Sequence, residues 1–284
     1  MTEARAVTAA APLAAAAALA SGAVDDESSR RAIVGNATGG GPVVGNATAG
    51  GVIVGGVTPF TTTDFPGRLA AVLFLQGCPW RCGYCHNPHL VPARRDPEGG
   101  SREQAWDEVL AFLRSRCGLL DAVVFSGGEP TAQPGLAAAI REVRAFGFAI
   151  GLHTGGAYPR RLAAVLPLVD WVGFDAKAPT GRYAGVTGVE GSGASARESL
   201  ELLRASGVPY EVRTTVHPAL TPAAALLELA GELESRDIRA WVLQPFRPSG
   251  CADPAVVAAA PQGASIDPAL VASLAAFVPG VTVR

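Results

Sequence analysis

A regular alternation of strand-like and helix-like segments constrains the fold of this chain more than any other feature. Short apolar runs with β-branched and aromatic residues predict strands at 69–76, 122–126, 148–153, 171–175, 210–216 and 240–244. Helical patterns lie between and after them, at 102–116, 136–146, 160–166, 194–205, 222–235 and 268–277. Consecutive strand–helix units favour an α/β fold with a parallel sheet, curled into a partial (β/α)6 TIM-like barrel.

The first fifty residues have a different texture. Residues 1–24 are rich in alanine, and a Val-Gly-Asn-Ala-Thr motif occurs at 34–38 and again at 44–48, each copy leading into further glycines. Two copies are too few for a solenoid, and their glycines favour a flexible segment. The sequence therefore predicts a flexible Ala/Gly-rich leader at 1–51 and one folded domain at 52–284, of about 230 residues.

Charge and apolar patterning exclude several classes of partner. The formal net charge is −2, so there is no strongly basic surface that would favour nucleic acid. No run of roughly 18 strongly apolar residues predicts a transmembrane helix. The alanine-rich start resembles a signal peptide, but Pro12 interrupts it and clustered thiols belong in a reducing compartment. We expect a cytoplasmic protein that binds neither nucleic acid nor membrane.

Three of the five cysteines lie together as Cys78, Cys82 and Cys85, in the spacing C-x3-C-x2-C. Three thiolates can hold three irons of a [4Fe-4S] cluster and leave the fourth iron open to a substrate or cofactor. A zinc site completed by His86 or His89, a redox pair with a bystander, and buried thiols are the alternatives. The spacing is unusual for zinc and no second C-x2-C follows, so the iron–sulfur interpretation is favoured.

Polar or glycine-rich motifs follow every predicted strand. In parallel α/β barrels the chemistry lies on the loops at the carboxyl ends of the strands, so these motifs are predicted to meet on one rim. They are the cysteine loop, Ser126–Pro130, His153–Gly156, Asp175–Lys177, Arg213–His217 and Gln244–Arg247. Lys177 is the only lysine of the chain. A surface salt bridge is its ordinary role, but its place on the rim favours contact with a bound anion.

Taken together, these motifs resemble the radical S-adenosylmethionine (SAM) superfamily. Within it they resemble the activating proteins of anaerobic ribonucleoside-triphosphate reductase, in the longer branch of that family. The resemblance covers about residues 57–251 and implies a barrel of the radical SAM type. It is carried by Asp64–Gly67, Phe74–Cys78, Tyr84–Pro88, Phe125–Pro130, Phe174–Pro179, Glu211–His217 and Leu243–Pro248.

The resemblance implies a set of cofactor contacts. Cys78, Cys82 and Cys85 would ligate the cluster, and SAM would chelate the open iron. Gly127 and Gly128 would let the backbone approach SAM, because they lack side chains. The further residues expected to contact SAM are Tyr84, His86 and Asn87 near the adenine, Glu129 at the ammonium, Lys177 and Arg213 at the carboxylate or ribose, and Thr154, Asp175, Gln244 and Arg247.

One residue departs from the family pattern. His153 stands where activating relatives carry an acidic residue of a monovalent-cation site, although Thr154 and Asp175 still offer oxygens. The sequence leaves such a site open, and a histidine that only caps the strand end is the alternative. We expect Trp80 and His89 to shape the cysteine loop. Cys117 is expected to be a buried structural thiol. Cys251 follows the Gln244–Pro248 motif, so it is expected either to be buried in the same way or to approach the rim.

The function implied by the resemblance is that of a glycyl-radical activase. A reduced cluster would cleave SAM, and the resulting radical would take hydrogen from a backbone glycine of the anaerobic reductase. A reduced flavodoxin or ferredoxin would supply the electron. No catalytic residue is expected beyond the cluster-bound SAM. A radical SAM enzyme acting on a small molecule, such as a cofactor or nucleoside, and a non-catalytic iron–sulfur electron carrier are the alternatives.

Overall fold

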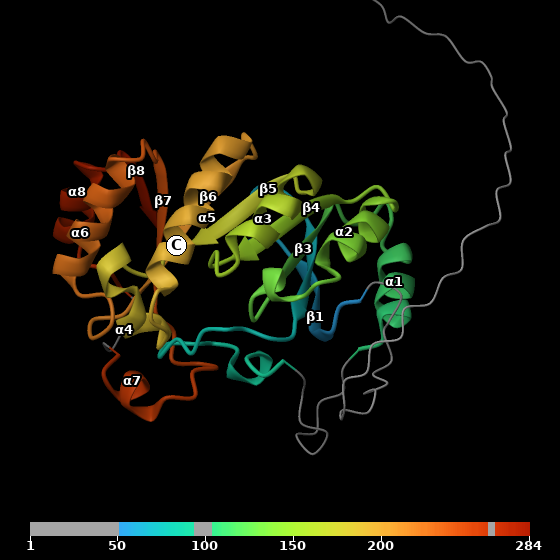
Figure 1. Cartoon of the computed structure of the whole chain (residues 1–284), viewed down its shortest axis with the longest axis horizontal. Coiled ribbons are helices and arrows are strands. Elements are labelled where there is room, and N and C mark those ends of the chain that lie inside the picture. The colour runs from blue at the N-terminus through green and yellow to red at the C-terminus, as the bar shows by residue number, and fades with distance from the viewer. Residues whose placement is uncertain (1–50, 94–103, 261–264) are drawn as a thin grey trace, which may run out of the picture. The chain divides into compact units, whose positions relative to one another are not determined.

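The computed structural model describes residues 51–93, 104–260 and 265–284. Its centre is one sheet in which eight strands lie side by side in the order of the sequence (Figure 1). The first strand is antiparallel to the second, and every later neighbour is parallel. The strands are β1 Val54–Thr61, β2 Ala70–Leu75, β3 Ala122–Gly127, β4 Ala149–Thr154, β5 Trp171–Asp175, β6 Tyr210–Val216, β7 Ala240–Pro245 and β8 Gly280–Val283.

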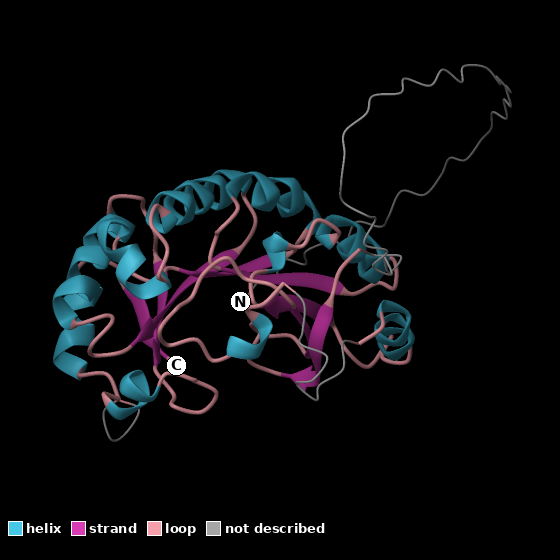
Figure 2. Ribbon diagram, turned by 60° about the horizontal axis from the view of Figure 1, so that its bottom comes forward, coloured by secondary structure: helices cyan, strands magenta, loops and turns pink. Residues whose placement is uncertain are grey.

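Helices cover the outer face of this curved sheet and leave its inner face to the loops (Figure 2). The α-helices are α1 Trp106–Arg114, α2 Leu136–Arg144, α3 Pro159–Val165, α4 Tyr183–Thr187, α5 Ser192–Ser206, α6 Ala223–Glu234, α7 Pro254–Ala258 and α8 Pro268–Ala275. Short 3-10 turns lie at η1 Pro88–Leu90, η3 Pro130–Ala132, η4 Leu166–Leu168 and η5 Thr180–Arg182. The order of strands and helices confirms the predicted α/β class, with β1 and β8 as the two edges of a sheet that does not close.

Local sequence explains where several helices begin and end. Gly191 and Gly207 flank α5 at its two ends, and both have left-handed backbone, with φ of 75° and 74°. A side chain disfavours that conformation, so these glycines stop the helix at low cost. Asp253 and Asp267 cap α7 and α8, because each carboxylate accepts hydrogen bonds from backbone N–H groups of the first turn.

Two apolar layers lie on opposite faces of the sheet. The outer layer packs large side chains of the strands against the helices, among them the fully buried Phe125 and Trp241. The inner layer is built from small strand residues, and Phe65 and Trp171 fill it as stacked rings 5.4 Å apart. Phe65 lies in the turn between β1 and β2, so this turn reaches the inside of the sheet and brings Asp64 toward the carboxyl ends of the strands.

Some expectations from the sequence need correction or lie outside the described residues. Cys117 is exposed, just past the end of α1, so the prediction of a buried thiol is wrong. Strands β1 and β8 and helices α4 and α7 were not predicted. Residues 1–50 of the predicted leader are outside the described part of the chain. Within the described part, no helix has the length and apolar character needed to cross a membrane.

Candidate functional site

A cavity of about 780 Å³, counting space open to solvent, lies at the carboxyl ends of β2 to β6. Most of the predicted site residues line this cavity. The motifs that follow different strands therefore come together at one edge of the sheet, as the sequence predicts. These residues are Cys78, Cys82, Tyr84, Cys85, His86, Asn87, Gly127, Gly128, Glu129, Thr154, Asp175 and Lys177.

The cavity is also lined by residues that were not among the predicted SAM contacts. Trp80 belongs to the cysteine loop, and His153 and Gly155 flank Thr154 within a motif that was predicted to lie on the rim. Val91, Ser126 and Thr215 complete this group. Of these residues Val91 carries no sequence signal, because it lies after the motif and reaches the cavity only through the folding of the loop.

The predicted residues Arg213, Gln244 and Arg247 do not line the cavity. Arg213 is buried behind it, and its guanidinium is engaged by other side chains and carbonyls. Arg247 is exposed after β7, and its carbonyl oxygen lies 2.9 Å from Nε2 of His86. Direct contact of these three side chains with SAM stays a prediction.

The cysteine loop is fixed at several points by backbone hydrogen bonds. Gly77 donates to Leu90 O at 2.7 Å and Cys78 donates to Val91 O at 3.0 Å, which ties the start of the loop to its return. The buried Gln76 strengthens that tie, because its amide nitrogen donates to the carbonyls of His89 and Pro92 at 2.9 Å each. The loop is thus held open across its width, with its cysteines toward the cavity.

The two glycines after β3 pack against the backbone of neighbouring segments. A Cβ on Gly127 would lie 2.3 Å from Leu75 N, and one on Gly128 would lie 2.4 Å from Gly77 O. Gly127 also has a φ of 121°, which a residue with a side chain rarely adopts. These glycines are therefore required to bring the loop after β3 against the cysteine loop, in addition to any approach of a cofactor.

Glu129 is buried and anchors the loops after β3 and β4 to each other. Its Oε1 accepts from the hydroxyls of Thr131 and Thr154 at 2.6 and 2.7 Å and from Thr131 N at 3.1 Å. Its Oε2 accepts from Gly155 N at 2.9 Å. Oε1 thus has three donors and Oε2 has one, so Oε2 retains capacity for a further donor in the cavity.

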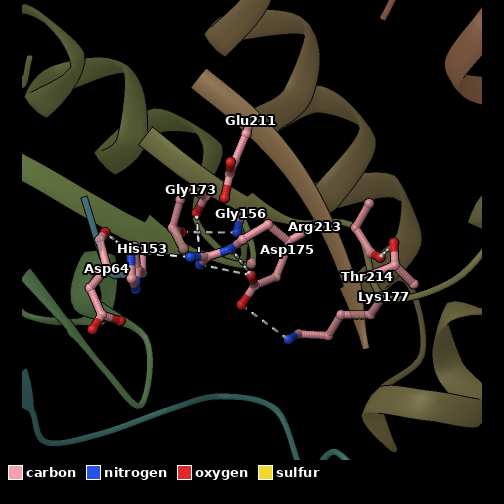
Figure 3. A network of polar contacts seen from close by, with 12 residues as sticks. Asp64, His153, Gly156, Gly173, Asp175, Lys177, Glu211, Arg213 and Thr214 are labelled. Atoms are coloured by element: carbon pink, nitrogen blue, oxygen red, sulfur yellow. Dashed lines mark hydrogen bonds and ion pairs between the residues drawn. The ribbon is translucent and has the colours of Figure 1, made fainter. Parts of the chain in front are cut away.

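Beyond Glu129 lie three charged side chains, which we call the charged wall: Lys177 and Asp175 line the cavity, and Arg213 lies behind them. Figure 3 shows Asp175 between Arg213 and Lys177, with His153 on the far side of Arg213. Arg213 Nε donates to Asp175 Oδ1 at 3.0 Å and Nη2 lies 2.9 Å from the same oxygen, while Lys177 Nζ is 3.7 Å from Oδ2. Two cations share one carboxylate, so this wall carries a net positive charge.

The environment shifts the pKa values of Asp175 and Lys177 in the directions that keep both side chains charged. Burial favours the neutral acid at Asp175, but Arg213 and Lys177 hold its pKa below the usual value. Burial also opposes the charge of Lys177, yet the acid groups of Tyr84, Cys82 and Asp175 hold its pKa well above the usual value. The Lys177 ammonium lies 5.9 Å from the ring centroids of both Trp80 and Tyr84, where it faces the cavity.

His153 lies between the turn that follows β1 and this charged wall. Its Nε2 is 2.8 Å from Asp64 O and 3.1 Å from Nη1 of Arg213. A neutral ring nitrogen either donates to the carbonyl or accepts from the guanidinium, so one of the two contacts is a hydrogen bond at a time. Burial and then the charge of Arg213 lower the pKa of His153 to about 4, which keeps the ring neutral near pH 7.

This depressed pKa predicts a loss of stability in mild acid. Between pH 6.5 and about 4 the unfolded chain binds a proton at His153 that the folded chain does not, so the free energy of unfolding falls as the pH is lowered. The loss from this residue amounts to about 3 kcal/mol. We expect urea unfolding at a series of pH values to show it in the wild type and not in His153→Gln. Equal pH dependence of the two proteins would contradict a neutral His153.

Comparison with known proteins decides the family. The model of the radical SAM superfamily matches residues 72–230, which is more than half of the chain and includes the cysteine loop. The chain belongs to the radical SAM superfamily. Cys78, Cys82 and Cys85 thus lie inside the region that defines the superfamily, as do Glu129 and Lys177.

Relatives of this radical SAM protein include proteins named as activating enzymes. A Methanocaldococcus jannaschii protein named as a glycyl-radical enzyme activating enzyme is 28% identical over 204 residues, which are 69% of this chain and 81% of the relative. The pyruvate formate-lyase-activating enzyme of Clostridium pasteurianum is 28% identical over 195 residues, 66% of this chain and 79% of the relative. A radical SAM methyltransferase from Sphaerobacter thermophilus shares the fold, with a TM-score of 0.54 at 16% identity over 79% of this chain and 68% of that one.

Radical SAM proteins use a [4Fe-4S] cluster and SAM, and the donor set of this cavity fits both. Among the described residues, no three His, Cys, Asp or Glu side chains gather closely enough to hold a single metal ion. A cluster does not need such a gathering, because each thiolate binds a different iron. The part of the cavity wall outside the cysteine loop offers partners for the ammonium and the carboxylate of SAM, namely the carboxylate of Glu129 and the ammonium of Lys177.

Burial disfavours the charged form of two of the three thiols of the cysteine loop. Burial raises the pKa of Cys78 to about 12 and also raises that of Cys82. Both sulfurs therefore stay protonated at neutral pH without metal. A coordinating metal displaces the proton of a thiol, so binding of the cluster would remove both protons.

Proposed function

We propose that this radical SAM protein is an activase that generates a glycyl radical on the anaerobic ribonucleoside-triphosphate reductase. The similarity to proteins named as glycyl-radical activating enzymes, at a matching length, carries the proposal. The motifs around the cavity support the choice of the reductase as the partner. The cytoplasm as its location and a reduced flavodoxin or ferredoxin as electron donor complete the proposal.

Each wall of the cavity has a part in this function. When bound, the cluster would supply the electron for reductive cleavage of SAM. Cys78, Cys82 and Cys85 would hold three irons and leave the fourth for SAM. Glu129 would accept from the SAM ammonium, and Lys177 would bind its carboxylate. The chain contributes binding, orientation and exclusion of water, and needs no general acid or base.

The buried Tyr84 and the backbone around it would hold the adenosine side of SAM. Burial raises the pKa of the Tyr84 phenol, so it stays neutral and acts as a wall and hydrogen-bond donor. His86 and Asn87 follow it in the same loop and line the same cavity. In this proposal the adenosine would lie against the cysteine loop, and the methionine part would lie against Glu129 and Lys177.

Removal of the Lys177 charge is expected to weaken SAM binding about tenfold to a hundredfold, since a hydrogen bond to a charged group contributes about 1.5–3 kcal/mol. The measurement is calorimetric titration of SAM into cluster-loaded Lys177→Ala under anaerobic conditions. Lys177→Arg is the matched control, because it keeps the charge and is expected to retain part of the affinity. An unchanged affinity in Lys177→Ala would contradict the proposed contact.

The proposed function is tested by mixing cluster-loaded protein, SAM, a strong reductant and the cognate anaerobic reductase, and recording the EPR spectrum. A glycyl-radical doublet on the reductase is the expected result. Formation of 5′-deoxyadenosine without a protein radical would reject the partner and favour a small-molecule substrate. Failure to bind SAM at all would favour an iron–sulfur electron carrier.

A further inference from the structure

The segment that runs from the end of β7 into α7 lies against the cysteine loop and does not line the cavity, and Arg247 is its only residue among the predicted SAM contacts. We call residues 246–256 the brace. In Figure 1 this part of the chain, which leads into α7, lies near the loop that follows β2. The two segments are more than 150 residues apart in sequence, so their contact is set by the fold alone.

Gly250 makes the tightest of these contacts. It has a φ of 88°, and a Cβ on it would lie 2.6 Å from His86 O and 3.6 Å from His86 Cα. Real Cβ atoms do not approach a backbone oxygen so closely, so a side chain here would push the brace away from the cysteine loop. The backbone of the brace thus packs directly on the residue after Cys85.

The side chain of His86 holds the same junction from the other direction. Its Nε2 lies 2.9 Å from Arg247 O, and since a carbonyl only accepts, the ring nitrogen is the donor. The ring stacks on Phe246, with centroids 5.4 Å apart and planes 18° apart. Backbone packing, a hydrogen bond and ring stacking therefore act together on one residue of the loop.

A second junction lies at Gly83, between Cys82 and Cys85. Cys251 Sγ donates to Gly83 O at 3.5 Å. A Cβ on Gly83 would meet Leu220 at 3.4 Å and Val256 at 3.7 Å, so both apolar side chains pack over it. The brace consequently contacts the loop on both sides of Cys85.

The brace is itself fixed to the sheet. The fully buried His217 donates from Nε2 to Val256 O at 2.9 Å and accepts from Ala219 N at Nδ1, 3.2 Å away. Its ring meets Phe246 edge to face at 4.9 Å. Phe246 N also donates to Val216 O at 3.0 Å. The brace therefore connects the ends of β6 and β7 rigidly to the cysteine loop.

We propose that the brace holds the half of the cysteine loop that carries Cys82 and Cys85 in the shape that retains an iron–sulfur cluster, with Gly250 as its principal positioning residue. Within this half of the loop itself, one backbone hydrogen bond fixes the turn, from Cys85 N to Cys82 O at 3.0 Å. The loop alone therefore contributes little to its own shape. Helix α4 supports the loop as far as Gly83, because Arg81 N donates to Thr187 O at 2.7 Å and Gly83 N donates to Val186 O at 3.2 Å. The brace acts at Gly83 and beyond it, at His86. Ligands that are held in place before metal arrives bind it more tightly.

The coupling works in both directions, because a segment that stabilises the cluster is stabilised by it to the same extent. Loading the cluster is thus expected to slow amide hydrogen exchange in residues 246–256 as well as in the cysteine loop. This inference rests on the proposed cluster site, but not on the identity of the substrate or partner.

The test compares Gly250→Ala with Gly207→Ala. Both glycines have left-handed backbone, with φ of 88° and 74°, but a Cβ on Gly207 would meet nothing within 4 Å. The two substitutions thus impose similar backbone strain, and only the first pushes on His86. We expect Gly250→Ala to lose iron to a chelator roughly tenfold faster than the wild type, while Gly207→Ala retains it, since one or two kcal/mol changes an equilibrium by a factor of about 5–30.

Hydrogen exchange of the metal-free proteins separates this inference from the proposed function. Faster exchange at residues 82–87 in Gly250→Ala than in Gly207→Ala supports the brace even if the wild type takes up no cluster. Phe246→Leu, which keeps an apolar side chain but removes both ring contacts, is expected to show the same two effects. Equal iron loss and equal exchange in Gly250→Ala and Gly207→Ala would overturn the proposal.

Discussion

Replacing Cys82 by alanine is expected to abolish cluster assembly and to lower SAM cleavage by more than about a thousandfold, because the cofactor carries the chemistry that the protein cannot supply itself. Cys82 lines the cavity and lies in the middle of the three thiols. Two remaining thiolates would leave a second iron of the cube without a protein ligand. The measurements are iron and sulfide content after reconstitution and the yield of 5′-deoxyadenosine.

The matched control for this substitution is Cys117→Ala. Cys117 is exposed beyond α1 and does not line the cavity, so its loss is expected to leave iron content and SAM cleavage at wild-type values. Alanine is smaller than cysteine and fits at position 82 without a clash, so both variants are expected to fold. Full iron content in Cys82→Ala would exclude the proposed ligand set.

The second large effect is expected on stability, from Asp175→Asn. Asp175 is the one carboxylate shared by Arg213 and Lys177, and the Arg213 side chain is only 9% exposed. The amide keeps the shape and an acceptor oxygen but removes the negative charge, which leaves a buried guanidinium uncompensated. The Asp175 side chain is 36% exposed, so we expect the free energy of unfolding to fall by about 2 kcal/mol, less than for breaking a fully buried ion pair.

Glu228→Gln is the control for this carboxylate-to-amide change. Glu228 pairs with Arg182, and both side chains are about half exposed. Exposed pairs of this kind contribute less than about 1 kcal/mol, so little change is expected in chemical denaturation. If Asp175→Asn were as stable as Glu228→Gln, the claim that the Asp175 carboxylate stabilises the buried Arg213 would be wrong.

Much of the architecture could be predicted from local patterns. The buried parallel strands are short apolar runs, such as Trp171–Asp175, whose predicted and observed limits coincide. The motifs after these strands meet because carboxyl ends of parallel strands share an edge, which is a rule of topology. Strand β1 was missed because its glycines resemble the preceding repeat, and β8 because it is short and mostly exposed.

The contacts that give each site residue its environment could not be predicted. Glu129 was predicted to contact the SAM ammonium, and the sequence did not indicate that its carboxylate also accepts from Thr154 and Gly155 on the next loop. His153 reaches Asp64, 89 residues away, because the turn after β1 enters the inside of the sheet. Such contacts depend on how the loops approach one another in space, and residue spacing along the chain carries no record of that.

The most direct test of a cluster with an iron open to SAM is the EPR spectrum of the reduced, cluster-loaded protein recorded with and without SAM. Binding of SAM to an iron of the cluster changes the spectrum of the cluster itself. We therefore predict a clear shift of its g-values on addition of SAM. An identical spectrum at a SAM concentration that saturates the protein by calorimetry would contradict an open iron between Cys78, Cys82 and Cys85.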